Sequence, residues 1–367
     1  MLNVDQIWQT QLQNRFSSGE SLESFFKITV EEKNLCSNFE SLQIPRCLIT
    51  PFFAMHMKAL RDTGRFSDFE ALRKQVIPSV KETEFSENET EDPLGARFHQ
   101  KMPRLIHQYN NRVLILATDR CISHCRHCFR RNFVQNNSGF IHSNSLFNIC
   151  SYLKSNPQVE EVLVSGGDIL LENDEKLTWL LEQIRGARPD ILIRLCTRAH
   201  VFLPQRFTGN MLAILKKFRP LWVISHINHP AELSTEAKKA ILATIDGGIP
   251  IQSQTVLLKG VNDKAEILTD LFNTLVKLSV KPGYLFQADL ALGTKHFRVP
   301  LKKALFLFKD LQQMLSGLSL PRFAVDLPNG GGKFNLEQLI QTKKVKKTSD
   351  EFIFYTRDGD EYIYPAD

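Results

Sequence analysis

The chain has 367 residues, 43% hydrophobic and 23% charged, which suits a globular protein with one large domain and terminal additions. No stretch approaches the roughly 20 apolar residues that span a bilayer, and no export signal is visible, so we expect a cytoplasmic protein without a membrane partner. The net charge of +6 is modest and the basic run 343–347 lacks interleaved aromatic residues, so we expect no nucleic-acid partner.

Residues 1–80 are predicted to form a helical amino-terminal region. Ile7, Trp8 and Leu12 are spaced as on one face of a helix, and a second run with this period covers 66–77. Residues 81–93 have little to bury, so we predict an exposed acidic linker there. Its acidic residues are Glu82, Glu84, Glu87, Glu89, Glu91 and Asp92.

Residues 94–335 alternate between short β-branched runs, which start about 30 to 50 residues apart, and amphipathic stretches such as 177–185. This rhythm predicts an α/β fold with parallel strands, arranged as a full or an incomplete (β/α) barrel. The predicted strands are 113–118, 161–165, 191–196, 222–226, 251–257, 283–287 and 322–326. Residues 336–367 are predicted to form a tail with a β-hairpin, because 352–355 and 362–364 flank a turn at 357–359.

Unusual polar residues follow or end the predicted strands. In a β/α barrel the carboxyl ends of the strands meet at one mouth, where active sites form. We therefore expect these residues to share a site. They are the cysteines at 121–128, Gly166, Gly167 and Asp168, Arg198, His226, Gln254, Asp289 and Asp326.

Cys121, Cys125 and Cys128 have the spacing C-x3-C-x2-C after the first predicted strand. Three thiolates on one loop can bind three irons of a [4Fe–4S] cluster and leave the fourth iron open. The alternative is a zinc site, which needs four ligands, so that His124 or His127 would have to supply the fourth.

This cysteine spacing resembles the signature of radical S-adenosylmethionine enzymes. The resemblance implies an incomplete (β/α) barrel and an open iron that binds the amino and carboxylate groups of S-adenosylmethionine. Gly166, Gly167 and Asp168 resemble the motif with which the superfamily holds the methionine amino group. Glycines allow a close approach of backbone to a ligand, although a plain turn is the alternative.

Longer motifs then follow one another between about residues 95 and 335. They include Cys128-Phe-Arg-Arg-Asn-Phe133, Val164-Ser-Gly-Gly-Asp168, His226-Ile-Asn-His-Pro230 and Asp326-Leu-Pro-Asn-Gly-Gly-Gly-Lys333. Together they resemble the lysine 2,3-aminomutase family. The resemblance implies an enzyme that moves the α-amino group of L-lysine to the β-carbon with pyridoxal phosphate and a 5′-deoxyadenosyl radical.

The resemblance also assigns cofactor contacts. It implies that Lys333 binds pyridoxal phosphate covalently, and the three preceding glycines would give its amine access to the aldehyde. Arg112 corresponds to a contact with the cofactor phosphate, but Gln108 stands where the family has a second arginine. Gln254 and His226 correspond to positions near the cofactor and S-adenosylmethionine; a buried, hydrogen-bonded histidine is the alternative for His226.

For the substrate, the resemblance implies that Arg130 binds the carboxylate, which suits the planar guanidinium fork. Asp289 and Asp326 correspond to the pair that binds the ε-ammonium group of lysine. Two acids at a barrel mouth could instead bind a divalent metal or act as acid and base. The same reaction on glutamate or arginine is the alternative activity, and a non-catalytic cysteine-cluster protein that binds zinc or nucleic acid is the alternative class.

The chain departs from clostridial-type members of the family, which carry a zinc site that ties subunits together through carboxyl-terminal cysteines. No cysteine follows Cys196, so the resemblance leaves open whether the chain forms a homo-oligomer. In length the chain resembles the shorter bacterial branch that makes β-lysine for elongation factor P. That branch, however, lacks the Gly-Gly-Gly-Lys form. A reductant such as flavodoxin or ferredoxin is implied as a partner.

Overall fold

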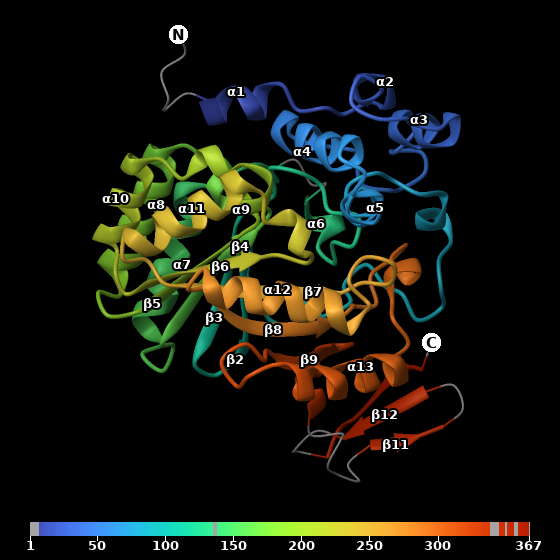
Figure 1. Ribbon diagram of the computed structural model, residues 1–367. Helices are drawn as coiled ribbons and strands as arrows, with labels where there is room; N and C mark the ends of the chain where they lie inside the picture. Colours follow the sequence, from blue (N-terminus) through green and yellow to red (C-terminus); the bar gives the residue numbers. More distant parts are fainter. Residues whose placement is uncertain (1–6, 135–137, 338–344, 349–350, 356–358, 367) are drawn as a thin grey trace.

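One ten-stranded sheet forms the centre of the molecule (Figure 1). The computed structural model describes residues 7–134, 138–337, 345–348, 351–355 and 359–366. Along the sheet the strands lie in the order of the sequence, from the first to the tenth. They are β1 (Gln100–Met102), β2 (Leu105–Tyr109), β3 (Arg112–Thr118), β4 (Glu161–Gly166), β5 (Leu192–Thr197), β6 (Leu221–His226), β7 (Ile251–Leu257), β8 (Lys281–Gln287), β9 (Arg322–Leu327) and β10 (Gly332–Asn335).

Strands β3 to β9 are parallel, whereas β1, β2 and β10 pair antiparallel at the two ends of the sheet. All seven predicted strands are present within two residues of the expected bounds. The strand order starts at β1 and ends at β10 without closing, so the barrel is the incomplete one. The prediction of an α/β fold with a parallel sheet is confirmed, and β1, β2 and β10 were not predicted.

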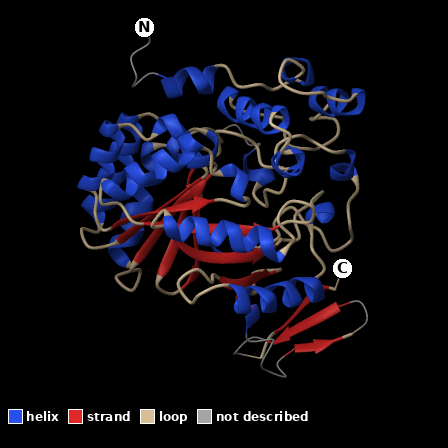
Figure 2. Ribbon diagram, in the orientation of Figure 1, coloured by secondary structure: helices blue, strands red, loops and turns tan. Residues whose placement is uncertain are grey.

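Helices between the parallel strands cover one face of this sheet (Figures 1 and 2). In the helix between β7 and β8, the buried residues Leu268, Leu271, Phe272 and Leu275 recur at helical spacing and form its inner face. The main helices of this layer are α7 (Ser143–Ser155), α8 (Asp174–Ala187), α10 (Gly209–Lys217), α11 (Thr235–Asp246), α12 (Ala265–Lys277) and α13 (Leu301–Met314). Two short helices, α6 (Arg131–Val134) and α9 (Ala199–Phe202), follow β3 and β5.

The other, concave face of the sheet is only partly covered. In β7 the residues that alternate with the buried ones, Gln252, Gln254 and Val256, keep partial exposure. Successive side chains of a strand point to opposite faces, so these three face the hollow of the incomplete barrel. The hollow is therefore lined by side chains that remain available to a ligand.

The amino-terminal region is helical, as predicted, and packs on the barrel. Its buried side chains, Phe53 among them, belong to the same hydrophobic cluster as those of the strands. The Thr50 hydroxyl donates a hydrogen bond to the Phe202 carbonyl (2.7 Å), which ties this region to α9. The helices are α1 (Ile7–Gln13), α2 (Gly19–Leu22), α3 (Val30–Ser37), α4 (Pro51–Asp62) and α5 (Phe66–Lys74).

The acidic segment 81–93 is not uniformly exposed. Glu84, Glu87 and Glu91 are exposed, but Glu82 and Glu89 are buried, so the prediction is wrong for these two residues. Their carboxylates are paired with arginines of the barrel, which offsets the cost of burying a charge. The segment therefore anchors part of the barrel.

The tail forms a separate three-stranded sheet, β11 (Val345–Lys347), β12 (Glu351–Tyr355) and β13 (Glu361–Pro365). Strands β12 and β13 pair antiparallel, which confirms the predicted hairpin, although 357 and 358 of its turn lie outside the described residues. The buried Tyr364 donates a hydrogen bond to the Ala288 carbonyl (2.7 Å), so the tail supports the segment that carries Asp289.

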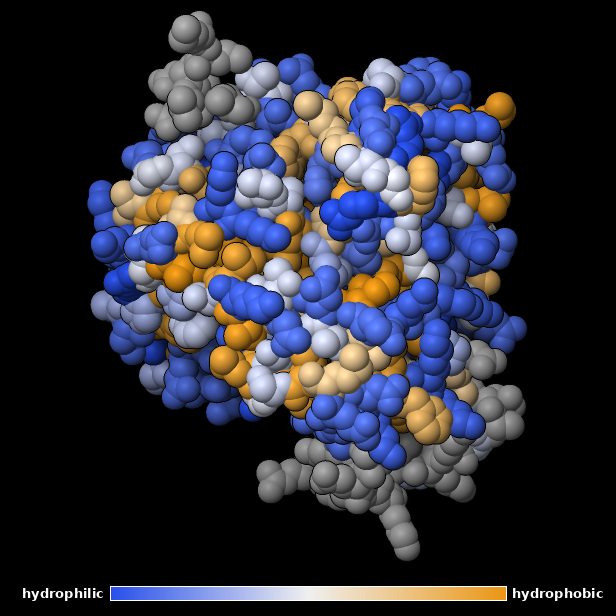
Figure 3. Space-filling model, in the orientation of Figure 1, coloured by the Kyte–Doolittle hydropathy of each residue, from blue (hydrophilic) through white to orange (hydrophobic). Residues whose placement is uncertain are grey.

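The surface drawn in Figure 3 is mostly hydrophilic, with apolar side chains in scattered patches. Within the described ranges, no helix combines the length and the apolar character needed to cross a bilayer.

Candidate active site

The three clustered cysteines lie in the loop between β3 and α6 as half-buried free thiols. Burial, and after it the charges of the other two sulfur atoms, raises the pKa of Cys121 well above its usual value. Burial, with the charge of Cys125, raises the pKa of Cys128 to about 11. The thiols thus lie close enough to influence one another, and they favour the protonated form until a cation replaces the protons.

His124 and His127 are the two histidines of this loop that could complete a zinc site with the cysteines. A closed zinc site needs four such ligands around one ion, whereas the cysteines of a cubane each bind a different iron. His124, one possible fourth ligand, is engaged through Nδ1 with the Arg46 carbonyl (2.9 Å).

Amino-terminal residues hold the cysteine loop from outside the barrel. The guanidinium of Arg15 donates to the carbonyl of Cys121 (2.7 Å). The hydroxyl of Ser123 donates to the carbonyl of Leu48 (2.5 Å). The loop is thereby fixed at both backbone and side chain by segments that are distant in sequence.

A buried ion cluster fixes the rest of the loop. Arg126 binds Glu82 through two parallel hydrogen bonds of 2.8 and 2.7 Å, and both side chains are fully shielded from solvent. Arg131, at the start of α6, also contacts Glu82 at 3.3 Å. One carboxylate thus holds arginines on both sides of Cys128, and its burial makes it costly to remove.

The Gly166–Gly167 pair approaches the cysteine loop itself. A β-carbon on Gly167 would lie 2.0 Å from the carbonyl oxygen of Arg120, and one on Gly166 would lie 2.4 Å from that of Thr118. The amides of Gly167 and Asp168 donate to these same two carbonyls at 2.6 and 2.8 Å. The glycines are therefore required for backbone contact between β4 and the start of the loop.

Asp168 orients the residues that follow β5. Its carboxylate accepts the hydroxyl of Thr197 at 2.7 Å and the backbone amide of Arg198 at 2.8 Å. Burial raises the pKa of Asp168, and these hydrogen bonds oppose that rise. Nη1 of Arg198 lies 2.9 Å from the sulfur of Cys125. The carboxyl ends of β4 and β5 therefore converge on the cysteines.

His226 and Gln254 lie beside each other on β6 and β7. His226 is half-buried and hydrogen-bonded through Nε2 to the side-chain oxygen of Asn228 (2.9 Å). Burial, helped by the charge of Arg198, lowers the pKa of His226 to about 3, so the ring stays neutral at physiological pH. His226 is thus a hydrogen-bonded histidine, which was the alternative to a ligand-binding role. Because the contact with Asn228 engages only Nε2, the other edge of the half-buried ring can still contact a ligand.

Lys333 lies on β10, opposite Asp326 on β9. Its backbone amide donates to the hydroxyl of Tyr109 (2.8 Å). Its Nζ atom lies 3.1 Å from both carboxylate oxygens of Asp326 and 4.0 Å from the ring centre of Phe286. An ammonium group between a carboxylate and an aromatic face is well stabilised. The side chain is 23% exposed, so it is also accessible.

Asp289 and Arg130 complete this end of the site. Burial, and next the charge of Asp326, raises the pKa of Asp289 to about 8, while Lys333 and Arg130 oppose the rise. The charges of Cys128, Cys196 and Asp289 act on Arg130, so Arg130 lies near the cysteine loop and near Asp289. The guanidinium of Arg130 rests on the ring of Phe129 and has no hydrogen-bond partner among the described residues.

Around the glycine loop, Gln108 and Arg112 play different parts. Gln108 donates its side-chain amide to the Gly330 carbonyl (3.1 Å), so it supports the backbone of the loop. The guanidinium of Arg112 lies 3.7 Å over the ring of Tyr109. Tyr109 therefore connects Arg112 to Lys333, a role that sequence reasoning missed because β2 was not predicted.

A cavity of about 570 Å³ opens at the amino-terminal end of the barrel hollow. Tyr284 lines this cavity, and the centre of its ring lies 5.0 Å from the Nζ atom of Lys333. The cavity and the lysine are therefore adjacent. Its charged lining residues are Arg194, Lys281 and Arg322, with Glu161 paired to Arg194 at 2.9 Å. The cavity therefore has a surplus of positive charge and can accept an anionic group.

Residues 111–216 match the family described as a 4Fe-4S single cluster domain. A Treponema pallidum protein named "Putative L-lysine 2,3-aminomutase" is 48% identical, covering 82% of this chain and 85% of that protein. The L-lysine 2,3-aminomutase of Acetoanaerobium sticklandii is 38% identical, covering 89% of this chain and 77% of the relative. The glutamate 2,3-aminomutase of Clostridioides difficile is 31% identical, covering 96% of this chain and 81% of the relative.

Proposed function

The chain belongs to the lysine 2,3-aminomutase family of radical S-adenosylmethionine enzymes, and we propose that its own substrate is L-lysine, converted to β-lysine. Membership makes the protein an aminomutase, an isomerase that shifts an amino group within one molecule. A relative named glutamate 2,3-aminomutase is 31% identical to this chain, so the choice of lysine needs its own argument.

The contact between Asp326 and Lys333 carries that argument. The ammonium group of Lys333 lies 3.1 Å from both oxygens of Asp326. The charge of Lys333 also acts on the carboxyl group of Asp289, whose pKa is raised by burial. The ammonium group of Lys333 thus occupies the position beside the acid pair that we assign to the terminal ammonium group of a lysine substrate. Once Lys333 is engaged with a cofactor, the acid pair lacks a cation and is ready to bind another.

The acid pair also discriminates between substrates. The side-chain carboxylate of glutamate would meet the carboxylate of Asp326, and like charges in a partly buried site repel strongly. The guanidinium of arginine carries the required charge but is larger and planar. Charge therefore favours lysine and arginine over glutamate, and the assay described below separates the first two.

Arg130 is the group we assign to the substrate carboxylate. Its guanidinium lies against the ring of Phe129, and none of the described residues occupies its hydrogen-bond donors. The groups whose charges act on Arg130 include Cys128 at the cysteine loop and Asp289 of the acid pair, which supports this assignment. With Arg130 at one end and Asp289 and Asp326 at the other, an α-amino acid with a terminal cation would be held at both ends.

The residues around the cysteines fit an iron–sulfur cluster with S-adenosylmethionine. Two buried polar atoms there, Nδ1 of His127 and Nε of Arg198, have no hydrogen-bond partner among the residues that the structure describes. Buried polar groups are normally paired, so these atoms are candidates to bind a ligand. When bound, the cluster and S-adenosylmethionine supply the radical that removes hydrogen from the substrate.

Pyridoxal phosphate fits beside Lys333. The amine is accessible, and the basic cavity next to it can receive a phosphate group. Because Gln108 is engaged with the glycine loop, we propose that Arg112 and the cavity cations Arg194 and Arg322 hold the phosphate. When bound, this cofactor supplies a covalent attachment for the migrating amino group. The chain's part is to place both groups and to keep water from them.

The test is product analysis with the reconstituted enzyme under anaerobic reduction, with L-lysine, L-arginine and L-glutamate supplied separately. We expect β-lysine from lysine and no β-amino acid from glutamate. Asp326→Asn should raise the KM for lysine about 10- to 100-fold, because a charged hydrogen bond contributes about 1.5–3 kcal/mol. Asp263→Asn, which removes an acid paired with Lys303 away from the site, is the matched control. Turnover of glutamate, or an unchanged KM in Asp326→Asn, would contradict the proposal.

A further inference from the structure

Arg198 donates a hydrogen bond from Nη1 to the sulfur of Cys125 across 2.9 Å. The arginine follows β5 and is 7% exposed. A guanidinium so close to a cysteine sulfur carries both a directed N–H group and a full positive charge. Because Arg198 is shielded from water, its charge acts on the sulfur with little screening.

The position of Arg198 does not depend on the cysteine. Its Nη2 atom donates to the carboxylate of Glu232 at 3.0 Å and to the side-chain oxygen of Gln75 at 3.2 Å. Its backbone amide is held by Asp168 at 2.8 Å, and its guanidinium lies 4.5 Å over the ring of Phe202. The contacts of Nη2, of the backbone amide and of the guanidinium plane thus aim Nη1 at Cys125.

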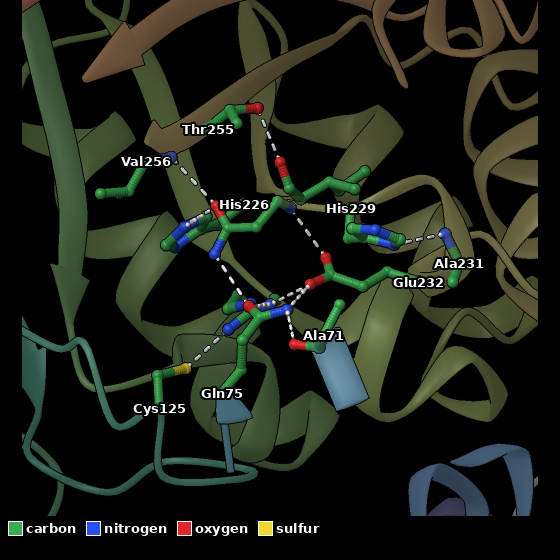
Figure 4. A network of polar contacts seen from close by, with 12 residues as sticks. Ala71, Gln75, Cys125, His226, His229, Ala231, Glu232, Thr255 and Val256 are labelled. Carbon is green, nitrogen blue, oxygen red and sulfur yellow. Dashed lines mark hydrogen bonds and ion pairs between the residues drawn. The ribbon is translucent and has the colours of Figure 1, made fainter. Parts of the chain in front are cut away.

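The residues that hold Arg198 are themselves fixed and buried. Gln75, at the end of α5, donates to Glu232 at 2.7 Å and is fully buried. The second oxygen of Glu232 accepts the backbone amide of Asn228 at 2.8 Å. Figure 4 shows these contacts converging between the helical amino-terminal region and the barrel. Because Gln75, Glu232 and Asn228 bind one another as well as Arg198, we expect this buried network to keep its geometry when a ligand arrives.

We propose that Arg198 sets the reduction potential of the iron–sulfur cluster through its N–H···S bond to Cys125. Reduction adds one negative charge to the cluster, and a hydrogen bond or cation at a cysteine sulfur stabilises the more negative state. Arg198 therefore makes the cluster easier to reduce. It is a positioning residue that acts through Cys125, and this role does not depend on which amino acid the enzyme isomerises.

Glu232 provides an opposing effect. Its carboxylate lies on the far side of the same guanidinium and offsets part of the positive charge. Loss of that negative charge would leave the arginine charge less compensated near the cluster. The two residues are thus expected to shift the potential in opposite directions, which general loosening of the site would not do.

The experiment measures the midpoint potential of the reconstituted, S-adenosylmethionine-free holoenzyme by redox titration followed by electron paramagnetic resonance. Arg198→Gln should lower the equilibrium constant for reduction about tenfold, a shift of about 59 mV to more negative values for one electron. Glu232→Gln should shift the potential to less negative values. Arg206→Gln removes another buried arginine, one that binds the carbonyls of Leu170 and Glu172, and should leave the potential unchanged.

Iron and sulfide content are measured for each variant, with S-adenosylmethionine binding as a separate readout. An unchanged potential in Arg198→Gln with a full cluster would overturn the proposal. So would shifts of the same sign in both site variants. Weaker S-adenosylmethionine binding without a change in potential would show that Arg198 is a cosubstrate ligand instead. If Arg198→Gln does not retain its cluster, Glu232→Gln decides, since the proposal requires a positive shift there.

Discussion

The cysteine loop and the Lys333 segment are held in place in different ways. Around the loop, Arg126 and Glu82 form a fully buried ion pair, and amino-terminal residues bind the backbone. Around Lys333 the contacts are few and partly exposed, with 23% exposure for the lysine and 19% for Asp326. A rigid surrounding suits a cluster that keeps one geometry, whereas an accessible lysine suits a group that must exchange partners. Changes at the loop should therefore affect folding, and a change of Lys333 itself should affect chemistry and not folding.

The largest effect is expected from Lys333→Ala. Loss of a cofactor-binding lysine should lower kcat by about 10⁴-fold or more, the scale seen when a covalent catalytic group is removed. The melting temperature and iron content should stay near those of the wild type, because the side chain is partly exposed. Turnover, absorbance of bound pyridoxal phosphate and iron content are the measurements. Loss of iron in this variant would show that the two regions are not independent.

The next effect is expected at the loop, from Glu82→Gln. This change leaves Arg126 and Arg131 with an uncompensated buried charge, which typically costs about 3–5 kcal/mol. The free energy of unfolding should fall by that amount, and the variant should take up less iron. The exposed Glu84→Gln is the matched control and should change neither quantity. Equal stability of the two variants would show that the buried pair does not anchor the loop.

Asp289→Asn tests the lysine region through pH. Burial raises the pKa of Asp289 to about 8 in the folded protein, against about 3.9 for an unfolded chain. Between these values the folded state holds a proton that the unfolded state has lost, so wild-type stability falls as the pH rises. Asparagine cannot ionise, so this loss is removed.

Thermal unfolding at pH 5 and pH 9 provides the measurement. We expect Asp289→Asn to be more stable than the wild type at pH 9 by at least about 1 kcal/mol, the value of one pKa unit. At pH 5 most of that advantage should disappear. Asp263→Asn, at an ion pair with Lys303, should show no such gain at pH 9. A constant difference across this pH range would contradict the raised pKa.

The smallest effect is expected from Tyr109→Phe. The phenylalanine keeps the ring under Arg112 but loses the hydroxyl that accepts the amide of Lys333. One such hydrogen bond contributes about 1 kcal/mol, which corresponds to a fall in kcat/KM of about fivefold. Steady-state kinetics at saturating pyridoxal phosphate would measure it. Gln108→Leu provides a comparison, since it removes the neighbouring contact with Gly330.

Much of the barrel follows from local sequence pattern. The seven parallel strands and the hairpin of β12 and β13 were predicted because β-branched runs and turn residues act over a few positions. The cysteine spacing likewise has a local meaning, since three thiolates on one loop can bind one cluster. Strands β1, β2 and β10 escaped prediction because they are short and depend on pairing at the ends of the sheet.

Other features depend on contacts between distant parts of the chain. That Lys333 faces Asp326 follows from the register of β9 and β10, and that Arg198 reaches Cys125 requires the strand ends to meet. Glu82 lies in a segment whose composition indicates exposure, yet an arginine 44 positions later buries it. Local sequence determined which groups the protein carries and the loops on which they lie. Only the tertiary structure decided their partners, because ion pairing and burial act through space and not along the chain.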